Sequence, residues 1–513
     1  MSHWIIAPVV IPALTASGML VARLGLKAQR VVSSVSIAAL LGTAIFLVWQ
    51  TAGGDIQTYA VGAWPAPFGI ILVLDRLSGL MVLLTAVVAL FSHLYAIHGW
   101  DAQGANYHAI FQFQLMGLMG AFLTGDLFNL FVFFEVLLIA SYGLLLHGGG
   151  DDQMRAGVHY VVFNLVGSAL FLIGVSLLYA VTGTLNMADL AVKVATVAPA
   201  DVALVRAGAL VLLVVFSVKA ALLPLYFWLP ATYSSAVAPV AALFAIMTKV
   251  GVYAILRVFV LIFGAGAGVA ARVSEPWLLP LALATLALGT LGAMASRGLR
   301  RMISYLVIAS VGTMLTAVAL GGVASVAAAI YYMIHSTVIL AALFLIADLI
   351  SRERGAAGDR LEPASAVAHP ALLGGLFLTA GMAVAGLPPL SGFIGKVLIL
   401  ESAVESPAAP WIFTIVLVTG LLTLVALSRA GSTVFWNVGA EPSAAGPVPA
   451  STMFPAVALL CVAIVLALLA GPVVDYAAAT ARQLVDPGDY IEAVLGGGAG
   501  ASPVAGSSAG EGR

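Results

Sequence analysis

The sequence contains very little cysteine and very little charge. Its 513 residues include a single cysteine, Cys461, so no disulfide can form within the chain. Charged residues make up 8% of the sequence, against about 25% in an average soluble protein. The formal net charge of -1 provides no basic surface for nucleic acid. One cysteine also cannot supply the several thiolate ligands of an iron–sulfur cluster.

Several motifs of soluble enzymes are missing as well. The chain has no Walker GxxxxGK[ST] loop, no GxGxxG followed by a suitable acidic residue, no CxxC pair and no HExxH. The sequence therefore predicts that the chain is not an enzyme and that it binds no ATP, NAD, flavin, iron–sulfur cluster or zinc. Energy for its activity has to come from an ion gradient or from a partner protein.

Apolar residues are what the sequence has in abundance. They form 62% of the chain, and the mean hydropathy is +1.12, which predicts an all-α polytopic membrane protein. Counting runs of about 20 apolar residues gives fourteen spans, or thirteen if one of the weaker runs near residues 115 and 214 fails. Their approximate centres are residues 13, 41, 86, 115, 137, 169, 214, 250, 287, 311, 335, 379, 422 and 462.

The distribution of lysine and arginine predicts the orientation of these spans. With the N-terminus outside, the loops after odd-numbered spans face the cytoplasm and hold most of the positive residues. The opposite loops and the C-terminal tail hold mainly Lys193, Arg206, Arg272, Arg482 and Arg513. The predicted cytoplasmic set is Arg23, Lys27, Arg30, Arg155, Arg297, Arg300, Arg301, Arg352, Arg354, Arg360 and Arg429. This asymmetry favours fourteen spans with both termini outside.

Ionisable side chains inside the predicted spans are the strongest functional signal. The chain has five lysines, and Lys219, Lys249 and Lys396 lie within or beside apolar spans, as does Glu135. A lysine near a helix centre costs about 2.5–3.5 kcal/mol on insertion scales, so such residues usually face the bundle interior and mark an ion pathway. Snorkelling from a helix end, or a structural ion pair, is the alternative for each lysine taken alone.

Prolines predict breaks in two of these helices. Pro224 follows Lys219 by five residues, and Lys396 follows the pair Pro388 and Pro389, seven residues after the second. Proline removes a backbone donor and clashes with the preceding turn. Non-helical backbone at membrane depth is tolerated only where protein or water satisfies it, and interrupted spans in two corresponding halves are typical of inverted-repeat transporters. An ordinary proline kink is the alternative.

Four stretches of the sequence resemble one family of membrane proteins. The stretches are TGDLFNLFVFFEVLLIASYGLL (124–145), SVKAALLPLYFWLPATYSSAVAPVAALFAIMTKVGVYAILR (217–257), RRMISYLVIASVGTM (300–314) and AGLPPLSGFIGK (385–396). They resemble the antiporter-like subunits shared by respiratory complex I and Mrp antiporters. Within that superfamily, the chain is most similar to the D-type subunits of Mrp-type monovalent cation/proton antiporters.

The resemblance implies a fold of about fourteen transmembrane helices that contains two inverted five-helix repeats, with helices 7 and 12 discontinuous. It divides the chain into helices 1–3 (1–108), a first repeat of helices 4–8 (109–262), a second repeat of helices 9–13 (275–436), helix 14 (452–472) and a low-complexity tail (486–513).

The resemblance also implies a proton relay at the middle of the membrane. Glu135 would pair with Lys219, Lys249 would be the central group, Lys396 the distal one, and His335 would connect the two halves. Burial disfavours the charged form of such groups and a nearby opposite charge favours it, so small movements can transfer protons. A lone histidine on an apolar helix is more often a core residue, so the role of His335 rests on the resemblance.

Some residues depart from the family pattern or are expected to be peripheral. The family often places a lysine shortly after the histidine, where this chain has Leu340. Asp348 is expected to be a charge that faces a loop. Asp75 and Asp126 are expected to open two spans, with a position near an ion entrance as the alternative for Asp126.

The predicted function is that of a membrane subunit of a multisubunit sodium or other monovalent cation/proton antiporter in the cell membrane of a prokaryote. Its predicted partners are other Mrp-type subunits, and it would act on cations and protons without a cofactor, a bound metal or nucleic acid. The alternative is a proton-pumping subunit of a redox-driven complex, of the complex I or membrane-bound hydrogenase type. A scaffold that retains the fold without transport is disfavoured by the lysines.

Overall fold

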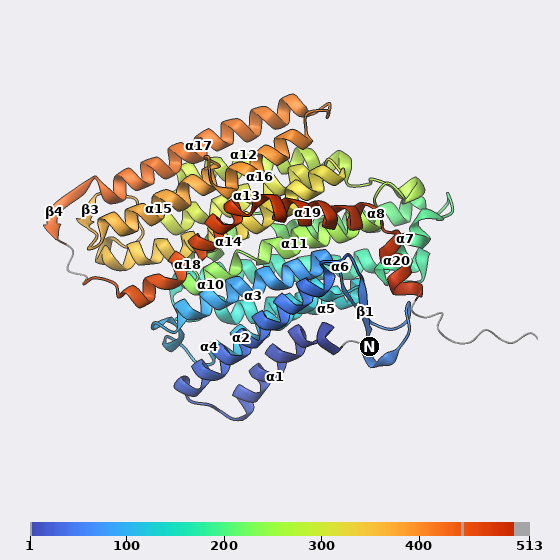
Figure 1. The fold of residues 1–513 in the computed structure, drawn as a ribbon, viewed down its shortest axis with the longest axis horizontal. Coiled ribbons are helices and arrows are strands. Elements are labelled where there is room, and N and C mark those ends of the chain that lie inside the picture. Colours follow the sequence, from blue (N-terminus) through green and yellow to red (C-terminus); the bar gives the residue numbers. More distant parts are fainter. Residues whose placement is uncertain (1–2, 443–445, 497–513) are drawn as a thin grey trace, which may run out of the picture.

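The N-terminal part of the chain contributes two long helices and one shorter apolar helix. The computed structural model describes residues 3–442 and 446–496, and most of its helices run along the long axis of the molecule (Figure 1). Apolar segments become helices in a membrane because a helix satisfies its own backbone hydrogen bonds. The elements of this part are η1 (His3–Ile5), α1 (Ala7–Val21), α2 (Leu26–Thr51), β1 (Gln57–Ala60), η2 (Val61–Ala63), β2 (Ile71–Leu74), α3 (Arg76–Ala96) and η3 (Trp100–Ala102). Strands β1 and β2 pair antiparallel, with Gln57 opposite Leu74.

The middle of the chain contains the first of the two interrupted helices. Its elements are α4 (Tyr107–Leu123), α5 (Leu127–Leu145), α6 (Asp151–Thr182), α7 (Met187–Ala195), α8 (Val202–Ala220), α9 (Trp228–Ser235), α10 (Ala238–Phe244), α11 (Met247–Ile255), the π-helical segment η4 (Leu256–Ile262) and η5 (Gly268–Ala270). The predicted span near residue 250 therefore consists of three consecutive segments, α10, α11 and η4, and this interruption was not predicted.

The next part of the chain repeats the pattern of a broken helix. Its elements are α12 (Glu275–Ala295), α13 (Leu299–Val318), α14 (Val323–Glu353), η6 (Gly355–Ala357), β3 (Ala364–Ala366), α15 (Pro370–Ala385), α16 (Ser391–Ser402), α17 (Ala409–Phe435) and β4 (Val438–Pro442). Strands β3 and β4 pair in parallel at one end of the bundle. The breaks between α8 and α9 and between α15 and α16 confirm the two predicted discontinuous helices.

The C-terminal part differs from the prediction. Helix α18 (Ala450–Leu468) lies at the expected fourteenth span, but it is followed by α19 (Ala470–Val485) and α20 (Gly488–Leu495). A tail beginning at residue 486 is therefore wrong. Residues 488–495 form a helix because Tyr490 and Val494 are buried, and α20 packs against α7. Residues 497–513, most of the predicted tail, lie outside the described residues.

A helical segment lies at each of the fourteen predicted centres, but not all of them are equally clear spans. Within the described residues, eleven helices are long and apolar enough to cross a membrane, and α1 and α15 are shorter apolar helices. Helix α4 carries Gln112, Gln114 and His108, which reduce its apolar character. The protein is thus a multi-pass, mostly helical membrane protein, and fourteen crossings remain a prediction.

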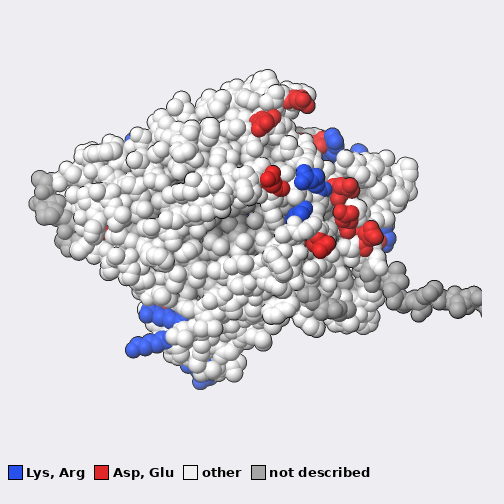
Figure 2. Space-filling model, in the orientation of Figure 1, with Lys and Arg blue, Asp and Glu red and all other residues white. Residues whose placement is uncertain are grey.

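Contacts between loops define the two ends of the bundle. At one end, called here the Arg30 end, Arg30 of α2 pairs with Asp101 of η3, and His147 contacts Trp100. At the other end, called the Tyr490 end, Tyr490 of α20 lies over Arg257. Figure 2 shows basic side chains at the α1–α2 loop, and acidic side chains together with several basic ones at the opposite end, near α19 and α20. On this face the acidic side chains therefore gather at the Tyr490 end.

A buried ion pair joins two helices near the Tyr490 end. The two terminal guanidinium nitrogens of Arg257 donate to the two carboxylate oxygens of Asp75 at 2.6 Å, and the rings of Tyr253 and Tyr490 lie near the guanidinium. Asp75 also caps α3 by accepting the backbone N–H of Ser78. Asp75 is 2% exposed, so it is a structural anchor as well as the first residue of its span. A charge buried this deeply is tolerated because it is fully paired and hydrogen-bonded.

Candidate ion-translocation site

The two helix breaks have the same local geometry. Ala221 and Gly386 both adopt left-handed backbone conformations, with φ values of 61° and 85°. One residue later, the N–H of Leu222 bonds to Ser217 and the N–H of Leu387 bonds to Met382, so each half-helix closes with the same wider turn. A cis proline follows in both, at Pro224 and at Pro389. This correspondence supports the division into two structural repeats.

Glu135 and Lys219 face each other through two small polar residues of α6. The hydroxyl of Ser168 lies within hydrogen-bond distance of both Glu135 and the backbone carbonyl of Asn164, one turn earlier, and has a single proton to share between them. The ammonium of Lys219 donates to Asn164 Oδ1 at 3.0 Å and lies 5.8 Å from the centre of the Phe134 ring. The structure thus places an amide and a hydroxyl between the carboxylate and the ammonium, rather than a direct ion pair.

Lys219 and Lys396 both lie beside a helix break, but on opposite sides of it. Lys219 is the penultimate residue of α8, the first half of its helix. Lys396 belongs to α16, the second half, but its Nζ donates to the carbonyls of Ala385 and Val384 at 2.7 and 3.3 Å, at the end of α15. The C-terminal carbonyls of a helix carry partial negative charge, which favours a cation.

The absence of a side chain at Gly386 makes room for Lys396. A Cβ at Gly386 would lie 2.7 Å from Lys396 Cδ. The stem of the lysine therefore passes over the left-handed turn and brings its ammonium to the helix end. Unlike Lys219, which is 7% exposed, Lys396 is only partly buried within this chain, as is Glu135.

Lys249 lies between Lys219 and Lys396 and is completely buried. Its ammonium contacts Ser310 Oγ of α13 at 3.5 Å. On one side, a cavity of about 10 Å³ next to Lys219 is lined by Met247 and Val250, the neighbours of Lys249 on α11. On the other side, Ser310 lines a second cavity of about 20 Å³ that also contains Lys396. Each cavity has space for about one water molecule.

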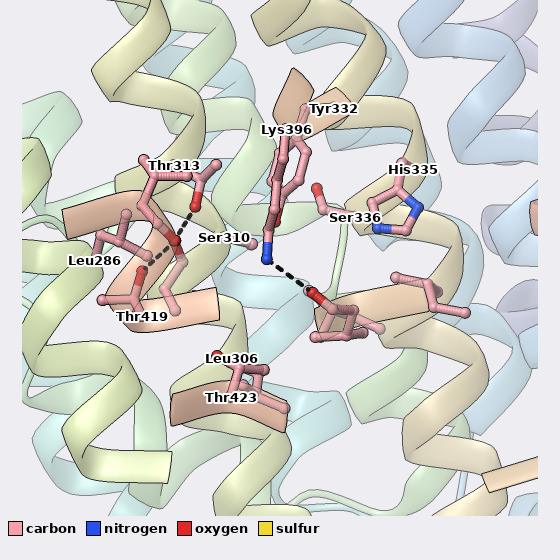
Figure 3. A pocket seen from close by; sticks show the side chains of 15 residues that line it. Leu286, Leu306, Ser310, Thr313, Tyr332, His335, Ser336, Lys396, Thr419 and Thr423 are labelled. Atoms are coloured by element: carbon pink, nitrogen blue, oxygen red, sulfur yellow. Dashed lines mark hydrogen bonds between the residues drawn. The ribbon is translucent and has the colours of Figure 1, made fainter. Parts of the chain in front are cut away.

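The second cavity gathers polar side chains from several helices. Figure 3 shows Lys396 projecting into it, with Ser310 and Thr313 on one side and Ser336 and His335 on the other. His335 Nδ1 lies 2.8 Å from Ser391 Oγ, at the start of α16, so the imidazole bridges α14 and α16. The structure therefore brings His335 and Lys396 to one cavity, and Leu340 lines the same cavity in place of the lysine that the family often has.

The small polar residues that connect the ionisable groups were not predicted from the sequence. Asn164 and Ser168 are four residues apart in an apolar helix, a spacing that places both on one face. That spacing could have indicated them, because two polar residues on one face of a membrane helix usually meet a polar partner. Ser310 offers no such signal, since isolated serines in membrane helices often bond only to their own backbone.

Asp348 is not the loop-facing charge that was expected. It is 2% exposed and accepts hydrogen bonds from Tyr95 (2.7 Å), Trp100 (3.1 Å) and Arg352 (2.8 Å). The prediction failed because α14 continues for another turn, to Glu353, and α3 and η3 cover this face of it. Asp348 thus connects α14 to the Arg30 end of the bundle.

The arrangement can move a proton, since it supplies a series of groups that bind and release one. Glu135, Lys219, Lys249 and Lys396 alternate with hydroxyl, amide and carbonyl groups that can hold water. In the described part of the chain, no three His, Cys, Asp or Glu side chains are grouped as metal ligands. The chemistry that the ionisable and hydroxyl side chains of this series offer is proton transfer.

Comparison with known proteins gives the chain a family. Residues 124–423 match the family model described as NADH:quinone oxidoreductase/Mrp antiporter, transmembrane region. A probable K(+)/H(+) antiporter D-type subunit of Rhizobium meliloti (strain 1021) is 44% identical over 468 residues, covering 85% of this chain and 86% of that protein. The Na(+)/H(+) antiporter D-type subunit of Bacillus subtilis (strain 168) is 39% identical over 499 residues, covering 96% and 100%.

A solved structure agrees with these relatives. One chain in the structure of the Mrp complex from Dietzia sp. DQ12-45-1b superimposes with a TM-score of 0.88 at 28% identity. The superposition covers 96% of this chain and 100% of that chain. The similarity therefore extends over the described helices from the N-terminal part to the C-terminal part, well beyond the residues that the family model matches.

Proposed function

Because the chain belongs to the NADH:quinone oxidoreductase/Mrp antiporter family, we propose that it is the D-type subunit of a multisubunit monovalent cation/proton antiporter. Its relatives of 39–44% identity are named as D-type subunits of K(+)/H(+) or Na(+)/H(+) antiporters. The complex exchanges a monovalent cation from the cytoplasm for protons from outside. A proton-pumping subunit of a redox-driven complex shares the family and the fold, but the names of these relatives favour the antiporter.

The observation that carries this function is the buried series of ionisable groups. Along this series, protons move among Glu135, Lys219, Lys249, His335 and Lys396, and Asn164, Ser168 and Ser310 keep the intervening space polar. The break after α15 supports this route, because it lets the Lys396 ammonium lie against free carbonyls at membrane depth. Glu135 and Lys396, at the two ends of the series, are the members that reach the surface of this chain.

The composition of the native complex tests this function. A tagged copy of the chain, purified from its own membranes in mild detergent, is expected to bring down small hydrophobic subunits and a larger antiporter-like subunit. The measurement is mass spectrometry of the purified complex together with a cation/proton exchange assay in vesicles. Subunits that oxidise quinol or hydrogen and carry iron–sulfur clusters would instead support the redox-driven alternative.

We also propose a location in the plasma membrane with both termini outside. Ala356 of η6 and Asp489 of α20 are exposed and lie at the Arg30 end and the Tyr490 end, respectively. In a Cys461→Ser background, Ala356→Cys is expected to react with an impermeant maleimide only in everted vesicles, and Asp489→Cys only in intact cells. The asymmetry follows from the excess of basic residues at the Arg30 end. Labelling of both positions from the same side would contradict the fourteen-span topology.

A further inference from the structure

A second group of buried titratable residues lies at the Arg30 end, away from the series of lysines. It consists of His93 on α3, His108 on α4, Asp101 on η3, Arg30 on α2 and His147 after α5, and it is called here the histidine cluster. His93, His108 and Asp101 are 0% exposed. The rings of His93 and His108 lie 5.3 Å apart, centre to centre. The proton relay described above uses none of these residues.

Hydrogen bonds fix where each imidazole holds its proton. Asp101, which also accepts two bonds from Arg30 at 2.6 and 2.7 Å, lies 3.0 Å from His108 Nε2, so this nitrogen must donate. Ser34 uses its only hydroxyl proton on the carbonyl of Arg30 and therefore accepts from His93 Nε2, which is 2.8 Å away. Each ring thus keeps a free lone pair on Nδ1.

These two Nδ1 atoms have no hydrogen-bond partner among the described residues. Further unpartnered buried polar atoms follow on the same helices: Tyr107 OH, Ser92 Oγ, and both the oxygen and the nitrogen of Gln114. The hydroxyl of Thr248, next to Lys249, is also buried without a partner. Buried polar groups are rarely left unpaired, because each costs about 1–3 kcal/mol, so a set of six residues indicates water.

The order of these residues leads from the Arg30 end to Lys249. Helix α4 packs against α11, and Tyr253 OH donates to the carbonyl of Phe122 at 2.6 Å near their far ends. Both helices begin nearer the Arg30 end and reach this contact near their C-terminal ends. The distance of a residue from the contact, measured along its helix, therefore shows how close that residue lies to the Arg30 end. At 1.5 Å per residue, Gln114 lies about 12 Å and Thr248 about 7.5 Å before the contact. Gln114 is therefore about 4.5 Å nearer to the histidine cluster than Thr248 is.

We propose that the histidine cluster is a proton port that connects Lys249 to the solution at the Arg30 end through water held by Gln114 and Thr248. A proton leaves the Lys249 ammonium, crosses this water, binds Nδ1 of His93 or His108, and leaves to the solution, after which the imidazole is neutral again. In the proposed topology this end is cytoplasmic, so the port is the exit for protons that entered from outside. The inference rests on the proposed antiport function and adds to it the place of proton release.

The charges around the two rings suit this task. The groups that face them are Arg30, Asp101, His147 and Tyr107. Burial raises the pKa of Asp101, but the hydrogen bonds from Arg30 and His108 outweigh it and leave the pKa below its usual value. Asp101 therefore remains a carboxylate at neutral pH and offsets the charge of Arg30.

Gln114→Leu is the sharpest test, because it removes the polar atoms without opening a cavity. Assembled complexes are compared in vesicles by cation-dependent proton exchange between about pH 6.5 and 9. Gln114→Leu should slow exchange by roughly tenfold and leave the melting temperature of the complex unchanged or higher, since an unpaired buried amide is lost. His108→Gln should slow exchange, because the amide cannot bind and release the proton that the Nδ1 lone pair takes up. The control His98→Gln, a partly exposed histidine on the next turn, should match the wild type.

Accessibility gives an independent measurement. In a Cys461→Ser background, Gln114→Cys should react with a small hydrophilic thiosulfonate reagent added at the Arg30 end. The port would be overturned if Gln114→Leu and His108→Gln both exchanged at the wild-type rate. If Glu135→Gln were inactive in the same assay, the proposed function would still stand. An unreactive Gln114→Cys in an active complex would also overturn it. Absence of exchange by the wild-type complex would overturn the proposed function itself.

Discussion

Glu135→Gln is expected to lower cation-dependent proton exchange by roughly tenfold or more while the complex still assembles. The glutamine keeps the size of the side chain and can still accept the hydrogen bond from Ser168, but it removes the negative charge. A neighbouring charge inside a protein is worth at least about 1.4 kcal/mol, which corresponds to a tenfold change in an equilibrium. Without it, the contacts of the Lys219 ammonium among the described residues would be Asn164 and the Phe134 ring.

The assay is proton exchange in everted vesicles between about pH 7 and 9, normalised to the amount of assembled complex. Glu135→Asp keeps the charge on a shorter side chain and should retain part of the activity with a shifted pH dependence. Glu401→Gln, an exposed carboxylate near the end of α16, is the matched control and should leave exchange unchanged. A wild-type rate for Glu135→Gln across this range would make the carboxylate structural, and the proton route would have to begin elsewhere.

Lys396→Ala is expected to have the larger effect, a loss of exchange of about 100-fold or more, the usual contribution of a positioned proton donor or acceptor. The ammonium lies in a polar cavity with Ser310 and His335 and is held by the carbonyls of Ala385 and Val384. Assembly should be largely preserved, since the lysine is partly exposed and makes no ion pair with another described residue.

Lys396→Arg separates the two roles that the lysine could have. Arginine keeps the positive charge and can still donate to the helix end, but it does not release its proton in proteins. We expect Lys396→Arg to be as inactive as Lys396→Ala. Recovery of exchange by the arginine variant would show that charge alone is needed, and normal exchange by Lys396→Ala would exclude an obligatory relay. Lys193→Ala, which removes an exposed lysine paired with Asp189, is the control for loss of a lysine elsewhere.

The partial exposure of Glu135 and Lys396 distinguishes them from Lys219 and Lys249. Glu135 belongs to α5, where Val132 and Ile139 are exposed, and Lys396 belongs to α16, where Phe393 and Val397 are exposed. Charged groups beside exposed apolar side chains at membrane depth are costly when they face lipid. The two ends of the proposed relay therefore lie where neighbouring subunits of the complex could cover them, whereas its centre is protected by this chain alone.

The sequence by itself determined that this protein lies in a lipid bilayer, where its helices are and which residues carry charge into the membrane. Long apolar runs have to become helices in lipid, because no water is present to satisfy their backbone groups. Isolated lysines and prolines in such runs are costly, so their positions in the sequence indicate buried functional groups and helix breaks. The breaks near Pro224 and Pro389 occur where they were expected.

Only the tertiary structure decided what lies between and around those charges. Asn164 and Ser168 separate Glu135 from Lys219, and Asp348 is buried, because helices far apart in sequence cover these side chains. The histidine cluster likewise forms from α2, α3, α4 and two loops. The apolar pattern of a membrane helix shows that it is inserted but not which of its faces meets another helix. Small polar residues cost little on insertion, so they leave little trace in the sequence until packing brings them together.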